Sequence, residues 1–317
     1  MVSSQRSYKT SARSLALEAG ETMHGVFAAV RIWQLWKRQG MPEIADRTAR
    51  RIFGGDRWDT CIDGLGMRES HKDAREQLQQ LAFNVLHTSE WADDAKDNVR
   101  TLANMELASI VYIDERLRYM DNWTIWVHDK RDPTTLVGIE QVFDVVLHYA
   151  DGVKIRYCGT IDGLTERQAT GEKYIEDNKT ASRLDDGWKL SFEMSHQITG
   201  YCAASSTVFG FPIMRSKIIG TKIKPTHRGE DCFWIEPVER NESFVQHWAH
   251  WVRHMVGIAE EYRDDYEHAP RFTHSCNRYF RPCSLIAFCA DTPVGREEQY
   301  NQMVPARLSP SERAITV

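Results

Sequence analysis

The spacing of apolar residues changes partway along the 317-residue chain, and this change constrains the fold more than any other feature. From about Ser14 to Tyr119, apolar side chains recur mostly at three- and four-residue steps, as they do along one face of an α-helix. From Ile139 to Tyr149, apolar and polar residues alternate, which is the pattern of a strand with one buried face. The sequence therefore predicts an α/β fold with a helical N-terminal region.

The helical region divides into several segments. The first helix is expected to begin near Ser14, another to run through Ala74–Leu86, and a longer one to extend from Asp97 to about Tyr119. The stretch from Asp56 to Ser70 has glycines within and beside it, so we expect it to be a loop.

The alternating region begins with a hairpin. Asp151 and Gly152 form a turn dipeptide between the strand Ile139–Tyr149 and a second arm, Val153–Ile161. Further strands are expected at Tyr174–Thr180, Lys217–Lys224 and Cys232–Val238, and further helices at Trp188–Ser206 and Ser243–Tyr262. The chain then divides into a helical region at 1–135, a strand-bearing core at 136–265, a cysteine-bearing segment at 266–290 and a loose tail at 291–317.

Composition excludes several classes of protein. Hydrophobic residues make up 42% and charged residues 27% of the chain, which is typical of globular proteins rather than disordered or fibrous ones. No apolar run approaches the roughly 18 residues that span a bilayer, and the polar N-terminal stretch lacks the apolar segment of a secretory signal. The seven cysteines are an odd number, which argues against a complete set of internal disulfides. We therefore expect a soluble, cytoplasmic protein.

Three charged residues on two successive strands suggest a metal site. Asp162 follows the second arm of the hairpin, and Asp177 and Lys179 lie two apart on the next strand, so they point to the same face. Two carboxylates at one sheet edge repel each other unless a cation lies between them, and Mg²⁺ or Mn²⁺ suits oxygen ligands. A lysine beside them can orient water and neutralise charge on a phosphate. Taken alone, such residues are more often solvated charges at a strand end.

Four short motifs occur in a characteristic order. They are Gly20-x-x-x-His24, Gly159-x-Ile161-Asp162, Asp177-x-Lys179-Thr180 and Gln197-x-x-x-Tyr201. In this order they resemble the motifs of the RecB-like branch of the PD-(D/E)XK nucleases, over about Leu17 to Cys289. The resemblance implies a mixed central sheet flanked by helices, with the nuclease core at 136–265. It also implies metal-dependent cleavage of DNA, by an exonuclease acting on ends in recombination, repair or phage DNA processing, in a bacterial or phage-infected host cell.

The same resemblance assigns roles to individual residues. It implies that Mg²⁺ or Mn²⁺ is held by the side chains of His24, Asp162 and Asp177 and by the backbone carbonyl of Asn178. Lys179 matches the catalytic lysine. Gln197 and Tyr201 lie one helical turn apart and match the last motif, where they would support the site and contact DNA. A buried polar pair is the competing interpretation of these two residues.

Two glutamates lie close to these motifs in the sequence. Glu176 alternates away from Asp177 along the expected strand, so we place it outside the metal site. Glu140 would lie near the site, but the sequence gives it no clear role.

Three cysteines near the C-terminus, Cys276, Cys283 and Cys289, resemble those that bind a [4Fe–4S] cluster in some members of this branch. Such a cluster requires four thiolates. In those members the fourth cysteine precedes the histidine motif, whereas no cysteine precedes His24 in this chain. Cys61 is a possible substitute, although it lies on the other side of that motif.

A net charge of -5 means that any DNA-binding surface must be a local basic patch. The candidates for it are Lys217, Lys222, Lys224 and Arg228. An ordinary solvated surface is the alternative interpretation of these side chains. For the whole chain, the alternatives to a DNA nuclease are a catalytically silent DNA-binding or scaffolding protein with the same fold and an RNA nuclease.

Overall fold

The computed structural model describes residues 15–67, 73–132, 134–150, 153–223 and 232–262, together with four two-residue strands outside these ranges. The chain forms two compact units. The larger unit comprises Leu15–Leu147 and Arg156–Ala249, and it contains both the helical region and most of the sheet. The smaller unit comprises Met1–Ser14, His148–Ile155 and His250–Val317. Two short strand pairs belong to it: β1 (Tyr8–Lys9) with β10 (Val304–Pro305), and β8 (Asn277–Arg278) with β9 (Arg281–Pro282).

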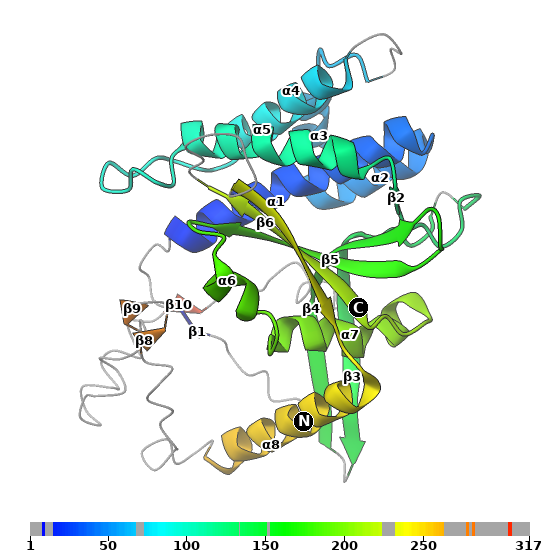
Figure 1. Ribbon diagram of the computed structural model, residues 1–317, viewed down its shortest axis with the longest axis vertical. Helices are drawn as coiled ribbons and strands as arrows, with labels where there is room; N and C mark the ends of the chain where they lie inside the picture. Colours follow the sequence, from blue (N-terminus) through cyan, green and yellow to red (C-terminus); the bar gives the residue numbers. More distant parts are fainter. Residues whose placement is uncertain are drawn as a thin grey trace. The chain divides into compact units, whose positions relative to one another are not determined.

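The helical region packs around the first helix, α1, which is drawn in dark blue in Figure 1. Its elements are α1 (Leu15–Trp33), the π-helical turn η1 (Gln34–Arg38), α2 (Pro42–Phe53), α3 (Gly55–Ile62), α4 (Ala74–His87) and α5 (Leu102–Tyr119). Every residue of α1 from Val26 to Trp33 is buried, because α1 lies between the other helices and the sheet. Because α1 is buried in this way, it holds in fixed positions the polar side chains that face the sheet.

The start of α5 differs from the prediction. Thr101 caps this helix, because its side chain accepts a hydrogen bond from the backbone N–H of Asn104. The predicted start at Asp97 is wrong, since the carboxylate of Asp97 accepts hydrogen bonds from the N–H groups of Val99 and Arg100 in a turn before the helix.

The predicted loop from Asp56 to Ser70 is also wrong in its first part, where α3 forms. Gly54, at a φ of 81°, turns the chain between α2 and α3. Trp58 and Cys61, three residues apart on α3, are both fully buried in the helical core. The prediction was based on the glycines beside this stretch and did not take account of an apolar pair at helical spacing.

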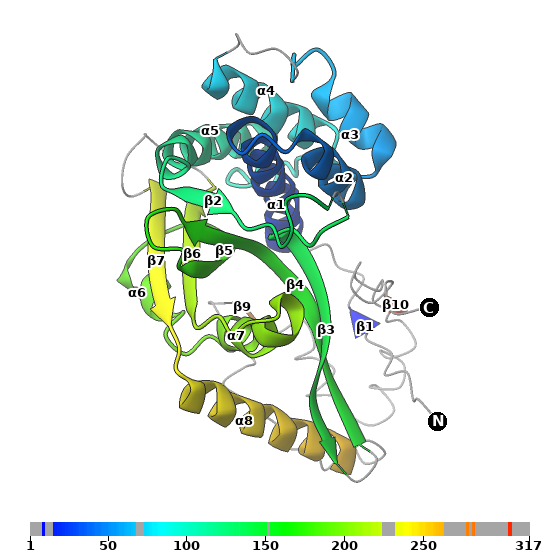
Figure 2. The same ribbon diagram turned by 90° about the vertical axis from the view of Figure 1, so that its right-hand side faces the viewer.

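A six-stranded mixed sheet lies against the helical region (Figures 1 and 2). Its strands are β2 (Trp123–Ile125), β3 (Ile139–Ala150), β4 (Val153–Arg167), β5 (Lys173–Ala181), β6 (Arg215–Lys222) and β7 (Phe233–Glu239). The order is β2-β4-β5-β6-β7, and β3 also pairs with β4. β5 and β6 are parallel, whereas β2–β4, β4–β5 and β6–β7 are antiparallel. The helices α6 (Asp186–Leu190) and α7 (His196–Phe209) lie between β5 and β6 in the sequence, and α8 (Glu242–Glu261) follows β7.

The two faces of the sheet bury different cores. Ile219 belongs to the core that the sheet shares with α1 and the other N-terminal helices, and Ile218 belongs to the core shared with α7. This alternation is the two-residue period of a strand covered on both faces. β4 extends to Arg167, so Asp162 lies inside this strand and not at its end as predicted.

The single helix predicted for Trp188–Ser206 is two helices, α6 and α7. Ser195 caps α7, since its hydroxyl accepts a hydrogen bond from the N–H of Ile198 at 3.4 Å. The guanidinium of Arg240 donates to the carbonyl of Phe192 at 2.9 Å and so satisfies the backbone where the helix is interrupted. The break matters because α7 carries Gln197 and Tyr201 into position.

The protein is thus an α/β protein with a mixed sheet flanked by helices, as the sequence predicts. Among the residues described, no helix has both the length and the apolar character needed to cross a bilayer.

Candidate functional site

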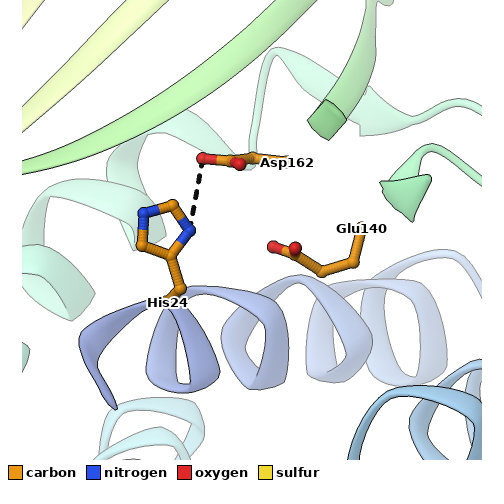
Figure 3. Close-up of side chains that lie close together, drawn as sticks. All are labelled: His24, Glu140 and Asp162. Atoms are coloured by element: carbon orange, nitrogen blue, oxygen red, sulfur yellow. Dashed lines mark ion pairs between the residues drawn. The ribbon is translucent and has the colours of Figure 1, made fainter. Parts of the chain in front are cut away.

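Three side chains from separate elements meet beside the sheet, as Figure 3 shows. They are His24 from α1, Glu140 from the beginning of β3 and Asp162 from β4. One nitrogen or oxygen ligand atom of each lies within 4.8 Å of those of the other two. His24 Nδ1 is 3.5 Å from Asp162 Oδ2. The structure therefore brings together the histidine and the first aspartate that the sequence motifs single out.

Glu140 is the member of this cluster to which the sequence motifs assign no clear role. Its φ is 43°, and it is the only non-glycine residue in the described part of the chain with a positive φ. The guanidinium of Arg51 donates to the carbonyl of Ile139 at 2.6 Å and helps to hold this strained backbone. Strain of this kind is concentrated at functional sites. A signal was present in the sequence, because the two-residue turn predicted at Asp151-Gly152 would place Glu140 beside Asp162 in the expected hairpin.

The carboxylate of Glu140 lies in an unfavourable environment for a charge. Part of the residue is exposed, but Oε1 is buried and has no hydrogen-bond partner among the described residues. Burial, and then the charge of Asp162, raise the pKa of Glu140 well above its ordinary value, against the opposing effect of Arg31. An unpartnered buried carboxylate oxygen costs free energy that a cation would recover.

Asp177 and Lys179 form the second part of the site, on β5. Lys179 Nζ is 2.9 Å from Asp177 Oδ1 and 2.9 Å from Gln197 Oε1. Asp177 is fully buried, and burial raises its pKa to about 6 although Lys179 acts in the opposite direction. The backbone N–H of Asn178 donates to Asp162 Oδ2 at 2.7 Å, which ties the two acid-bearing strands together.

The last motif approaches the same site from α7. Gln197 Nε2 donates a hydrogen bond of 2.8 Å to the hydroxyl of Tyr201, one helical turn further on. Gln197 is exposed, whereas Tyr201 is 5% exposed. The contacts therefore run from Asp177 through Lys179 and Gln197 to Tyr201, so that Tyr201 orients the amide that holds the lysine.

One of the predicted DNA-binding residues is internal. Lys217 is 5% exposed, and its Nζ lies 3.1 Å from the centre of the Trp123 ring and 3.4 Å from Glu176 Oε1. Burial, followed by Arg116 and Arg31, lowers the pKa of Lys217 to about 5. The prediction that Lys217 contacts a phosphate backbone is wrong, because β6 is a central strand with both faces covered. Lys222 is half-buried, and Lys224 and Arg228 lie outside the described residues.

The predicted iron–sulfur site can be assessed at only one of its residues. Cys276, Cys283 and Cys289 lie outside the described residues. Cys61 is fully buried in α3, with its sulfur 3.3 Å from Thr88 Oγ1, and burial raises the pKa of its thiol. The cluster stays a prediction, as does the metal contact assigned to the backbone carbonyl of Asn178.

The groups that converge here fit a divalent cation. The imidazole of His24 and the carboxylates of Glu140 and Asp162 are close enough to share one ion. Asp177, the other predicted metal ligand, lies on the neighbouring strand and is not part of this three-residue group. Oxygen ligands favour Mg²⁺ or Mn²⁺, and the imidazole favours Mn²⁺ of the two. The chain matches no protein-family model and no curated protein.

Proposed function

We propose that the protein is a divalent-metal-dependent DNA nuclease with a PD-(D/E)XK core of the RecB-like type. The observation that carries this proposal is the convergence of His24, Glu140 and Asp162 beside the contact between Asp177 and Lys179. The α/β architecture and the chain order of the four motifs support it.

The metal ligands in this proposal are His24, Glu140, Asp162 and Asp177. Glu140 is added to the set predicted from the sequence, because its buried Oε1 has no other described partner. When bound, Mg²⁺ or Mn²⁺ would supply Lewis-acid polarisation of a phosphodiester oxygen and a lowered pKa for water.

The protein's own residues supply a positive charge and hold that charge in a fixed position. The ammonium of Lys179 is held between Asp177 and Gln197, so its direction is fixed before a substrate arrives. A fixed cation stabilises the charge that grows on a phosphate during in-line displacement. Tyr201 holds Gln197 in turn. The side chain of Lys179 is 27% exposed.

The test is incubation of the purified protein with end-labelled single- and double-stranded DNA in Mn²⁺, Mg²⁺ or chelator. Cleavage is expected with either metal and not with chelator. Linear and closed circular DNA of the same sequence are compared, because an exonuclease degrades only the first. An RNA of matched sequence identifies an RNA nuclease.

Two variants show whether cleavage belongs to this site. Asp177→Ala and Lys179→Ala are each expected to lower the rate at least about 100-fold, the effect of one lost transition-state contact. Lys173→Ala is the matched control, since Lys173 lies on the same strand and pairs with Glu166 outside the site. Equal cleavage by the unaltered protein and by all three variants would show that the nuclease activity resides elsewhere. DNA binding without metal-dependent cleavage would identify a catalytically silent protein.

A further inference from the structure

A buried ionic cluster lies on the side of β5 opposite Asp177. Glu176 precedes Asp177 and therefore points to the other face of the strand, toward α1 and α5. Its carboxylate is fully buried and accepts hydrogen bonds from Arg31 at 3.2 Å, from Arg116 at 3.2 and 3.3 Å, and from Thr165 at 3.0 Å. Tyr119 also donates to this carboxylate.

Arg31 makes contacts that the other arginine of this cluster does not make. Its Nη1 donates to the backbone carbonyl of Asp162 at 2.8 Å, and its Nη2 reaches Glu176. With the carboxamide of Asn178 turned so that its oxygen faces Arg31, that oxygen accepts from Nη2 at 2.7 Å and from Nη1 at 3.0 Å. One guanidinium thus holds the main chain of Asp162 and the two residues on either side of Asp177.

Gly163 makes this arrangement possible. It pairs with Glu176 between β4 and β5, and a Cβ atom at this position would lie 2.7 Å from Cζ of Arg31. The planar guanidinium therefore rests directly on the backbone of β4, one residue from Asp162. A guanidinium has several donors in a fixed plane, and a lysine ammonium could not reach all three partners.

Stability alone is a weak explanation for such a cluster. Arg31, Arg116 and Glu176 are each 0% exposed, and burying charges costs free energy that their pairing often fails to recover. The two guanidinium groups exceed the one carboxylate, which leaves positive charge behind the acids of the metal site. The contacts of Arg31 instead fix the relative positions of two strands, each of which carries one of those acids.

We infer that Arg31 is a positioning residue for the metal site, which holds Asp162 and Asp177 at the separation that a single divalent cation requires. The inference rests on the metal site of the proposed function. It adds that the metal ligands are positioned by a residue on the opposite face of the sheet, which touches neither metal nor substrate.

The experiment measures Mn²⁺ binding directly, by the loss of the free-ion signal in electron paramagnetic resonance, at a temperature where every variant is folded. Arg31→Lys keeps the charge but loses the planar set of donors. It is expected to lower Mn²⁺ affinity by about 10-fold or more, as for other residues that support a metal ligand.

Arg116→Lys is the matched control. Arg116 is equally buried and binds the same carboxylate, but its other hydrogen-bond partner is Gln34 rather than Asp162 or Asn178. Both variants are expected to lower the melting temperature, and only Arg31→Lys is expected to weaken Mn²⁺ binding. Equal loss of affinity in both variants, or none in Arg31→Lys, would overturn the inference.

Asn178→Ala provides a second route if Arg31→Lys does not fold. It removes one partner of Arg31 beside Asp177 and leaves the buried charges in place. A several-fold loss of Mn²⁺ affinity supports the inference, and unchanged affinity overturns it. If the unaltered protein itself binds no Mn²⁺, the proposed function fails. If it binds Mn²⁺ and the variants bind equally well, only the inference fails.

Discussion

Replacement of Glu140 by glutamine should change stability in opposite directions with and without metal. Ligand atoms of Glu140 and Asp162 lie within 4.8 Å of each other. Two like charges at that distance repel by about 3 kcal/mol at an effective dielectric constant of about 20. Protonation of Glu140 relieves part of this repulsion, so Glu140→Gln should stabilise the metal-free protein by about 1–3 kcal/mol, or about 3–10 °C in melting temperature.

The size of the effect depends on pH. The pKa of Glu140 is raised in the folded protein, so the metal-free protein loses stability as the pH rises through that value. The advantage of Glu140→Gln should therefore be small near pH 4, where the carboxyl is protonated in both the folded and the unfolded state. It should grow toward pH 7.

Mn²⁺ should reverse the order of stability of the unaltered protein and Glu140→Gln. An ion at about 1,000 times its dissociation constant stabilises the protein that binds it by about 4.1 kcal/mol, which exceeds the advantage of about 1–3 kcal/mol that Glu140→Gln has without metal. The unaltered protein should gain this amount and Glu140→Gln should gain much less. Thermal unfolding with chelator and with Mn²⁺ measures both effects, and Glu166→Gln on β4 is the control. A metal-free Glu140→Gln protein that melts earlier, or one that gains as much from Mn²⁺, would contradict the reasoning.

Three further predictions concern the same chain. His24→Ala should weaken metal binding and reduce the preference for Mn²⁺ over Mg²⁺, because imidazole favours softer ions; calorimetric titration with both ions measures this. The rise in melting temperature caused by Mn²⁺ should grow between pH 5 and pH 7, since Asp177, with a pKa of about 6, must lose its proton to bind metal. If Cys276, Cys283 and Cys289 bind a cluster, anaerobically purified protein should contain iron and absorb visible light until dithionite is added; colourless, iron-free protein would exclude the cluster.

The acids and the lysine of the site could be predicted because they follow local rules. Asp177 and Lys179 lie two apart on one strand, and alternation alone puts them on one face. His24 was placed at the site by its motif, since more than a hundred residues separate it from the strands. Glu140 could be placed near the site from the expected hairpin, but its role could not be assigned, because the positive φ that accompanies it is not revealed by any pattern in the sequence.

Lys217, which was wrongly predicted to lie on the surface, shows a different limit of prediction from the sequence. The sequence gives the charge of Lys217 but not its burial, and a lysine with basic neighbours is most often on the surface. Here β6 lies between β5 and β7, and three aromatic rings surround the amine, those of Tyr119, Trp123 and Tyr174. The burial of Lys217 follows from the strand order, which depends on contacts between distant parts of the chain.

The hydrogen bond between Arg31 and the carbonyl of Asp162 joins residues 131 positions apart, and this separation has a kinetic consequence. Bringing such distant residues together costs loop-closure entropy before the contact stabilises the chain. We therefore expect the metal ligands on α1 and β4 to meet late in folding. Mn²⁺ should then slow unfolding in proportion to its binding and leave the refolding rate unchanged. Stopped-flow measurements with and without the ion would distinguish this order of events from one in which the ion nucleates the fold, since nucleation would accelerate refolding.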